Sequence, residues 1–99
     1  MTISADHYDE LVTIRHHIHE NPELSGQEFE TTAYLKAYLE GLNIEILETG
    51  LKTGLVAQVG QGEPVIALRA DIDALPILEN TGLSFASKNA GVMHACGHD

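Results

Sequence analysis

The stretch Val65-Ile66-Ala67-Leu68-Arg69-Ala70-Asp71-Ile72-Asp73 joins an apolar run to an acidic cluster. Its first four residues have the composition of a strand that is buried on both faces. Asp71 and Asp73 follow at the carboxyl end of this strand, the edge at which open α/β sheets place their chemistry. We therefore expect an α/β fold whose functional residues gather at this edge.

Two shorter runs upstream have the pattern of further strands. Ile44-Glu45-Ile46 alternates apolar and polar residues, and Leu55-Val56-Ala57-Gln58-Val59 is a second apolar run. The segment Gly60-Gln61-Gly62-Glu63-Pro64 leads from the second run to the third, and its shortness favours an antiparallel hairpin over a crossover. The sequence therefore predicts a mixed sheet.

Helical periodicity dominates the N-terminal part of the chain. Residues 5–20 place Leu11, Ile14 and Ile18 on one helical face, and Pro22 interrupts this helix. Ser25 and Glu28 have the spacing of a capping box for a second helix.

The second helix has a face formed by Thr32, Leu35, Leu39 and Leu42, with Gly41 as a left-handed stop. We expect the two helices to cover one face of the sheet.

The most specific chemistry lies in His94-Ala95-Cys96-Gly97-His98-Asp99. Residues 75–88 predict an irregular excursion, after which an extended path leads to Cys96. Cys96 and His98 are two positions apart, so in an extended segment their side chains share one face. Thiolate and imidazole suit Zn, Mn, Co or Ni better than Ca or Mg, so we interpret Cys96 and His98 as metal ligands.

Composition narrows the class of protein further. The chain has 99 residues, a hydrophobic fraction of 43%, and a formal net charge of −10, which disfavours binding to nucleic acids and anionic membranes. The N-terminus lacks the features of a signal peptide, no run has the length of a transmembrane helix, and the one cysteine excludes an internal disulfide. These features predict a cytoplasmic protein.

The ordered combination of motifs resembles the N-terminal signature of the two-metal amidohydrolases and metallopeptidases. This family includes hippurate hydrolases, N-acyl-amino-acid amidohydrolases and auxin-conjugate hydrolases. The resemblance covers the whole chain and is carried by residues 15–25 with Glu28 and Thr31, by residues 69–77 with Glu79, Thr81, Gly82 and Phe85, and by residues 91–99.

The resemblance implies a place for this chain within a larger protein. It makes residues 1–99 an N-terminal fragment of a three-layer αβα zinc-peptidase-like catalytic domain, in which two helices precede a mixed sheet. The remainder of that domain and an inserted lid or dimerisation domain would lie outside the chain. The general-base glutamate is expected beyond Asp99, so we expect no catalytic residue within the chain.

The resemblance also assigns roles to individual residues. Cys96 and His98 match the first two ligands of a pair of divalent ions, Zn, Mn, Co or Ni. Two donors alone bind weakly, so we expect poor occupancy in the isolated chain. Asp71 and Asp73 match an acidic motif that orients ligands, and His94 is a supporting candidate.

The implied activity is hydrolysis of the amide bond of a small N-acyl or N-aroyl amino acid, such as hippurate, by the parent enzyme. The alternative activity is that of an N-acetyldiaminopimelate deacetylase. Ala74 slightly favours the hydrolysis of general N-acyl amino acids over this alternative. Two other classes stay open: a hydrolase with Cys96 as nucleophile, and a non-enzymatic fragment that self-associates through uncovered sheet surfaces.

Two further groups of side chains have open roles. His16 and His19 share a helical face with metal-ligand potential, although a solvated or capping role is favoured for these residues and for His17. Arg69 is expected to pair with the neighbouring acids, with a substrate carboxylate as the alternative partner.

Overall fold

The first helix is α1 (Ala5–Glu20), which ends where the sequence predicts. The computed structural model describes residues 4–99; residues 1–3, which belong to the stretch considered for a signal peptide, lie outside the described residues. The Ser4 hydroxyl accepts a hydrogen bond from the His7 backbone N–H and caps the first turn. At the other end, the Asn21 side chain donates to the His17 carbonyl before the buried Pro22.

The second helix is α2 (Phe29–Gly41), and its cap differs from the predicted one. The Glu23 carboxylate accepts from the backbone N–H groups of Glu30 and Thr31, at 3.2 and 2.6 Å, and from the Thr31 hydroxyl at 2.7 Å. The predicted capping box is wrong. Ser25 lies in a turn before the helix, and Glu28, which occupies the N-cap position of α2, makes no capping hydrogen bond with its side chain.

The end of α2 also differs from the prediction. Gly41 is the last helical residue, and the left-handed conformation is instead adopted by Asn43, with φ of 59°. Asparagine tolerates this region better than other non-glycine residues because its short polar side chain bonds locally. The chain then turns directly into the first strand.

The sheet consists of two antiparallel strands, β1 (Glu45–Leu47) and β2 (Val56–Gln58). Ile46 pairs with Ala57 at the centre of the register. The connecting segment is fastened to the start of α2, where the Thr32 hydroxyl accepts from the Gly54 backbone N–H at 2.8 Å. The α/β class is thus confirmed, with two helices preceding a small antiparallel sheet.

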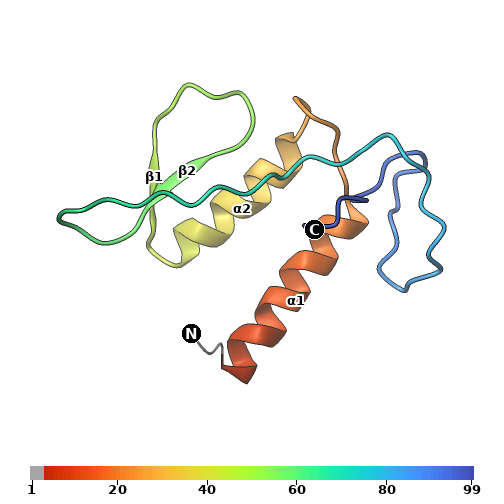
Figure 1. Cartoon of the computed structure of the whole chain (residues 1–99), viewed down its shortest axis with the longest axis horizontal. Helices are drawn as coiled ribbons and strands as arrows, with labels where there is room; N and C mark the ends of the chain where they lie inside the picture. Colours follow the sequence, from red (N-terminus) through yellow and green to blue (C-terminus); the bar gives the residue numbers. More distant parts are fainter. Residues whose placement is uncertain (1–3) are drawn as a thin grey trace.

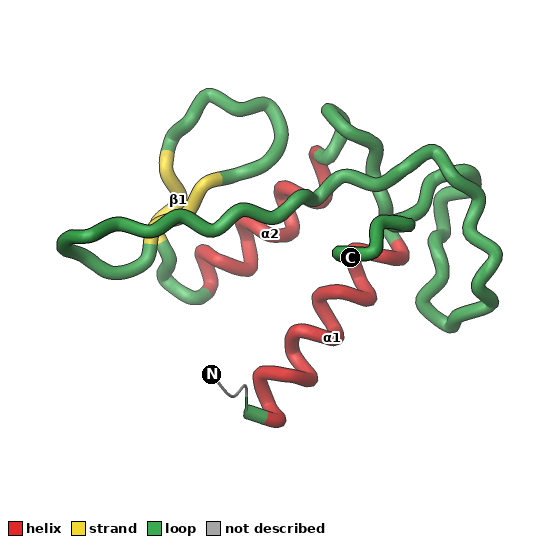
Figure 2. The backbone as a smooth tube through the Cα atoms, viewed as in Figure 1, coloured by secondary structure: helices red, strands yellow, loops and turns green. Residues whose placement is uncertain are grey.

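The third predicted strand and the mixed sheet are not present in the described residues. Residues 65–68 run on from β2 without a strand partner, so the predicted hairpin at residues 60–64 does not form (Figures 1 and 2). Val65, Ile66 and Leu68 are 78%, 82% and 97% exposed. A strand needs a neighbour to satisfy its backbone, and residues 4–99 offer none at this position.

The two helices occupy different places in the fold. α2 packs against β1, whereas α1 lies beside the C-terminal segment and away from the sheet (Figure 1). The expectation that both helices cover the sheet is therefore wrong for α1. No helix in the described part of the chain combines the length and the apolar character needed to cross a membrane.

Residues 75–88 form the predicted irregular excursion, and the chain closes on itself where Met93 returns to Leu75. Leu75 and Met93 exchange two backbone hydrogen bonds, of 2.8 and 2.9 Å. Ala74, only 2% exposed, donates its N–H to the Glu23 carbonyl at 2.8 Å. These contacts hold the end of the chain against the C-terminal end of α1.

Candidate metal centre

Cys96 and His98 lie on a turn at the end of the chain. The Asp99 backbone N–H donates to the Cys96 carbonyl at 3.1 Å, so the segment is a turn and not extended as the sequence suggested. The turn still brings the two candidate ligands together, with Cys96 Sγ 3.8 Å from His98 Nδ1. Both side chains are exposed and the thiol is free.

These two donors do not form a complete site with other residues of the described chain. Within residues 4–99, no three His, Cys, Asp or Glu side chains cluster closely enough to hold a metal ion. An exposed thiol beside an imidazole nevertheless has the donor chemistry of Zn-type ions, because neither group is committed to a buried contact. The pair therefore fits part of a metal centre that needs further ligands.

His94 is buried next to this turn with one nitrogen unpaired. The side chain is 9% exposed, and its Nε2 has no hydrogen-bond partner within the described chain. Burial lowers the pKa of His94, and the nearby carboxylates of Asp99 and Asp73 only partly oppose this effect. His94 is therefore held as a neutral imidazole.

The two predicted aspartates occupy different environments. Asp73 is half-buried and acts electrostatically on His94, as does Asp99. Asp71 is exposed and forms an ion pair with Arg69 at 2.7 Å, which is the expected pairing for Arg69. The structure thus brings Asp73 to the region of the candidate ligands and directs Asp71 to the surface.

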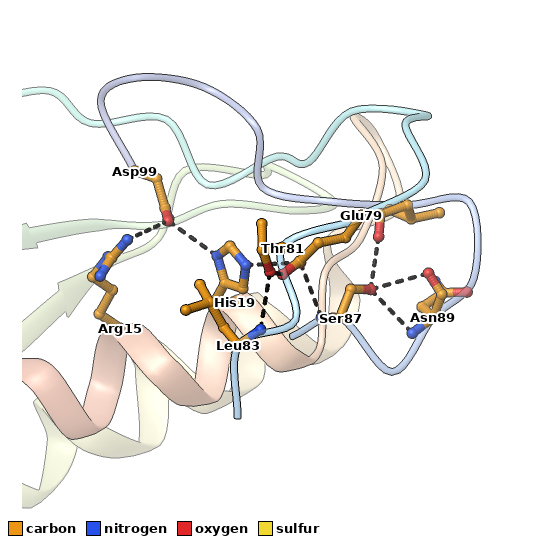
Figure 3. A network of polar contacts seen from close by, with 9 residues as sticks. Arg15, His19, Glu79, Thr81, Leu83, Ser87, Asn89 and Asp99 are labelled. Carbon is orange, nitrogen blue, oxygen red and sulfur yellow. Dashed lines mark hydrogen bonds and ion pairs between the residues drawn. The ribbon is translucent and has the colours of Figure 1, made fainter. Parts of the chain in front are cut away.

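A buried polar cluster that sequence reasoning did not identify adjoins the turn (Figure 3). His19 of α1 is 4% exposed, with Nε2 2.9 Å from Glu79 Oε1 and Nδ1 3.1 Å from Asp99 Oδ2. Arg15, one turn earlier, donates to the same Asp99 oxygen at 3.1 Å. Spacing places Arg15 and His19 on one helical face, but no local signal links them to Asp99.

Glu79 is fixed from both sides of its carboxylate. The Thr81 hydroxyl donates to one oxygen, and the Ser87 backbone N–H donates to the other at 3.0 Å. The Thr81 bond is the main cause that lowers the pKa of Glu79, with the Ser87 and His19 contacts adding to it against the opposing effect of burial. Glu79 is therefore an ionised partner for His19.

The other helical histidines pack against aromatic rings. His16 stacks on Phe85 with ring centroids 3.7 Å apart, and His17 stacks on Tyr34 at 4.0 Å. Phe85 also presents its edge to His19 at 5.5 Å. His19 therefore has a buried hydrogen-bonding role in place of the solvated or capping role that the sequence favoured, and His16 is half-buried against Phe85, whereas His17 stays exposed to solvent beside Tyr34.

Comparison with known proteins identifies the lineage of this fold and site. Residues 67–99 match the Peptidase family M20/M25/M40. The chain is 60% identical over 92 residues to an N-acetyl-L-cysteine deacetylase and 58% identical over 92 residues to an N-acetylcysteine deacetylase, both from Bacillus subtilis strain 168. These matches cover 91% and 90% of this chain but only 22% and 24% of the relatives.

A solved structure agrees with the sequence comparison. The Bacillus subtilis YXEP protein, described as a dinuclear metal binding peptidase from the M20 family, superposes with a TM-score of 0.90 at 53% identity. The match covers 96% of this chain and 28% of that protein. Shared motifs, shared fold and high identity lead to one conclusion: residues 67–99 carry the signature of Peptidase family M20/M25/M40, and nearly the whole chain is similar to part of an M20 family peptidase.

Proposed function

We propose that this chain supplies Cys96 and His98 as ligands to the metal centre of an enzyme that hydrolyses the amide bond of small N-acyl amino acids. The observation that carries the proposal is the exposed thiol and imidazole, 3.8 Å apart on one turn. The description of the YXEP relative as dinuclear supports a pair of divalent ions. When bound, such ions polarise the acyl carbonyl and lower the pKa of a coordinated water.

The residues of this chain would bind and orient. Cys96 and His98 provide the sulfur and nitrogen donors, while Asp73 and the neutral His94 lie at the edge of the site and limit its charge and hydration. The described residues hold no cluster of three or more metal-ligating side chains, and the general-base glutamate is proposed to lie in sequence beyond these residues.

The names of the relatives favour N-acetyl substrates over hippurate-like ones. Two relatives near 60% identity are N-acetylcysteine deacetylases. We therefore place small N-acetyl amino acids first in the proposed substrate class, ahead of N-aroyl amino acids and N-acetyldiaminopimelate. We also propose that residues 1–99 form the N-terminal part of a catalytic domain, that a lid or dimerisation domain is inserted elsewhere, and that the enzyme is cytoplasmic.

A chimera tests the catalytic proposal. The aligned residues of the Bacillus N-acetyl-L-cysteine deacetylase are replaced by those of this chain, and hydrolysis of N-acetylcysteine, other N-acetyl amino acids and hippurate is measured with Zn, Mn or Co. We expect turnover of N-acetyl substrates, and a loss of about 100-fold or more in kcat for Cys96→Ala and His98→Ala, because each removes a metal ligand.

Two controls define the outcome. His17→Ala, which alters only a stacking contact, should retain the activity of the chimera. The 99-residue chain alone should hydrolyse none of the substrates, because it contributes two of the donors that a site requires. Full activity of Cys96→Ala and His98→Ala would refute the ligand assignment.

The proximity of Cys96 to His98 also permits a second candidate, a thiol nucleophile activated by an imidazole. Alkylation by iodoacetamide separates the two roles. Metal that protects Cys96, with protection reversed by a chelator, supports ligation. Fast alkylation that neither metal nor chelator alters would support the nucleophile, provided His98→Ala slows it.

A further inference from the structure

His19 is enclosed between two carboxylates that come from distant parts of the chain. Glu79 contacts its Nε2 at 2.9 Å and Asp99 contacts its Nδ1 at 3.1 Å, while the ring is 4% exposed. Glu79 lies 60 positions from His19 and Asp99 lies 80 positions away. A helix surface needs no such arrangement for packing alone, since a buried apolar side chain would fill the same space at lower desolvation cost.

Both nitrogens of the ring face carboxylate oxygens. Glu79 is ionised, since hydrogen bonding from Thr81 is the main cause that lowers its pKa. The Asp99 oxygen that contacts His19 also accepts from Arg15, so one carboxylate oxygen links two residues of α1. The ring is therefore held between two acidic side chains, with a contact at each nitrogen that fixes its orientation.

Asp99 is the residue through which this cluster reaches the metal centre. Its side chain is held by Arg15 and His19, and its backbone N–H closes the turn on the Cys96 carbonyl. His98 precedes it directly in the chain. The Asp99 side chain is thus held by α1 (Figure 3), and the backbone N–H of the same residue links this contact to the turn that carries the candidate ligands.

We propose that His19 is a positioning residue which, held by Glu79, fixes the Cys96–Asp99 turn so that Cys96 and His98 present their donors to one divalent cation. The inference rests on the proposed function, because it takes Cys96 and His98 as ligands. A preorganised pair of donors binds a metal more tightly than a mobile pair, since less conformational freedom is lost on binding.

A metal-free NMR experiment tests the positioning itself. In the intact chain, we expect the amides of residues 96–99 to shift and exchange faster in His19→Gln than in the wild type. The matched control is His17→Gln, two positions away on the same helix and in contact with Tyr34 instead of the turn. Turn amides that respond equally to both substitutions, or to neither, would overturn the proposal.

A second variant removes the partner without altering α1. Asp99→Ala deletes both acceptor oxygens, and it should loosen the turn as His19→Gln does, while the circular dichroism of the helices stays unchanged. If Asp99→Ala leaves the exchange rates of residues 96–99 at the wild-type values, His19 has no positioning role.

Cobalt(II) titration measures the consequence for metal binding, through the absorption that appears when a thiolate binds cobalt. We expect His19→Gln to raise the apparent Kd about tenfold, as loss of a group that supports a ligand commonly does, and His17→Gln to leave it unchanged. Cys96→Ala should abolish the absorption.

The outcomes separate this inference from the proposed function. Equal affinity of His19→Gln and the wild-type chain, with binding still lost in Cys96→Ala, would overturn the positioning role alone. Thiolate–cobalt absorption that persists in Cys96→Ala would contradict Cys96 as a ligand, and the exchange rates would then decide the role of His19.

Discussion

Buried polar side chains set the character of this molecule at the residue scale. His19, Glu28, Thr31 and His94 are buried in the described residues, whereas Pro22 and Ala74 are the buried apolar residues there. A buried polar group stabilises a fold only when its partners are in place, so the hydrogen bonds around His19 and Glu79 specify one arrangement of segments distant in sequence. Substitutions at these positions should have effects beyond the loss of one contact.

Thr81→Val should raise the pKa of Glu79 toward its ordinary value of 4.5, because it removes the hydrogen bond that chiefly lowers it. A lowered folded-state pKa stabilises the fold above about pH 4.5, and this contribution is lost as the pH falls through the folded-state value. Carboxyl-carbon NMR titration measures the shift, with Thr49→Val as the control. An unaltered titration of Glu79 would contradict this account.

Phe85→Leu should destabilise the chain by about 1 kcal/mol, because the aromatic contacts with His16 and His19 are lost while apolar volume is largely kept. Urea unfolding followed by circular dichroism gives the change in free energy. The matched control is Phe29→Leu, since Phe29 is 56% exposed and has no such ring partner among the described contacts. Equal changes in the free energy of unfolding at both positions would show that the ring contacts of Phe85 add nothing to stability.

At the scale of elements, a single glutamate joins the helices to the rest of the chain. The Glu23 carboxylate caps α2, and the Glu23 carbonyl accepts from Ala74. Partial burial by itself raises the pKa of Glu23, but the hydrogen bonds from Thr31 and Glu30 outweigh it, so the pKa is lowered. The start of α2 therefore depends on a residue six positions before it.

Glu23→Ala should cost about 1 kcal/mol of stability at neutral pH, the usual effect of losing a helix cap. The wild-type advantage should shrink as the pH falls below about 4.5, because the lowered pKa of Glu23 stabilises the fold only while the carboxylate is ionised. Thermal unfolding of both proteins between pH 7 and pH 3 measures this. Glu40→Ala, at an exposed site on α2, is the control and should show neither effect.

At the scale of the whole molecule, one apolar segment is exposed to solvent. Residues 65–68 carry exposed Val65, Ile66 and Leu68 along an extended path with no strand partner in residues 4–99 (Figure 2). Exposed extended segments of this kind pair readily with other chains, whereas the net charge of −10 opposes close approach.

We therefore expect the isolated chain to self-associate more strongly as salt screens its charge. Light scattering at high protein concentration, between low and physiological ionic strength, measures the mass. Ile66→Lys combined with Leu68→Lys should keep the chain monomeric, while the control Lys36→Arg, which keeps the net charge, should not reduce association. A wild-type chain that stays monomeric in all conditions would refute the expectation.

The sequence by itself determined the local and chemical features of this protein. The periodicity of residues 5–20 and the position of Pro22 gave α1 its correct bounds, because both act within a few residues. The motif around Cys96 and His98, together with Asp71 and Asp73, predicted the similarity to the M20 peptidases that the family model finds in residues 67–99, since donor type and order are written directly in the chain.

Only the tertiary structure decided which distant residues meet. The cap of α2 comes from Glu23 instead of Ser25, and the support of the turn comes from His19 and Glu79. The third apolar run lacks a partner among the described residues, although its composition is that of a buried strand. Hydrogen bonds between residues 60 or 80 positions apart depend on how the whole chain closes, and no local pattern of residues encodes that geometry.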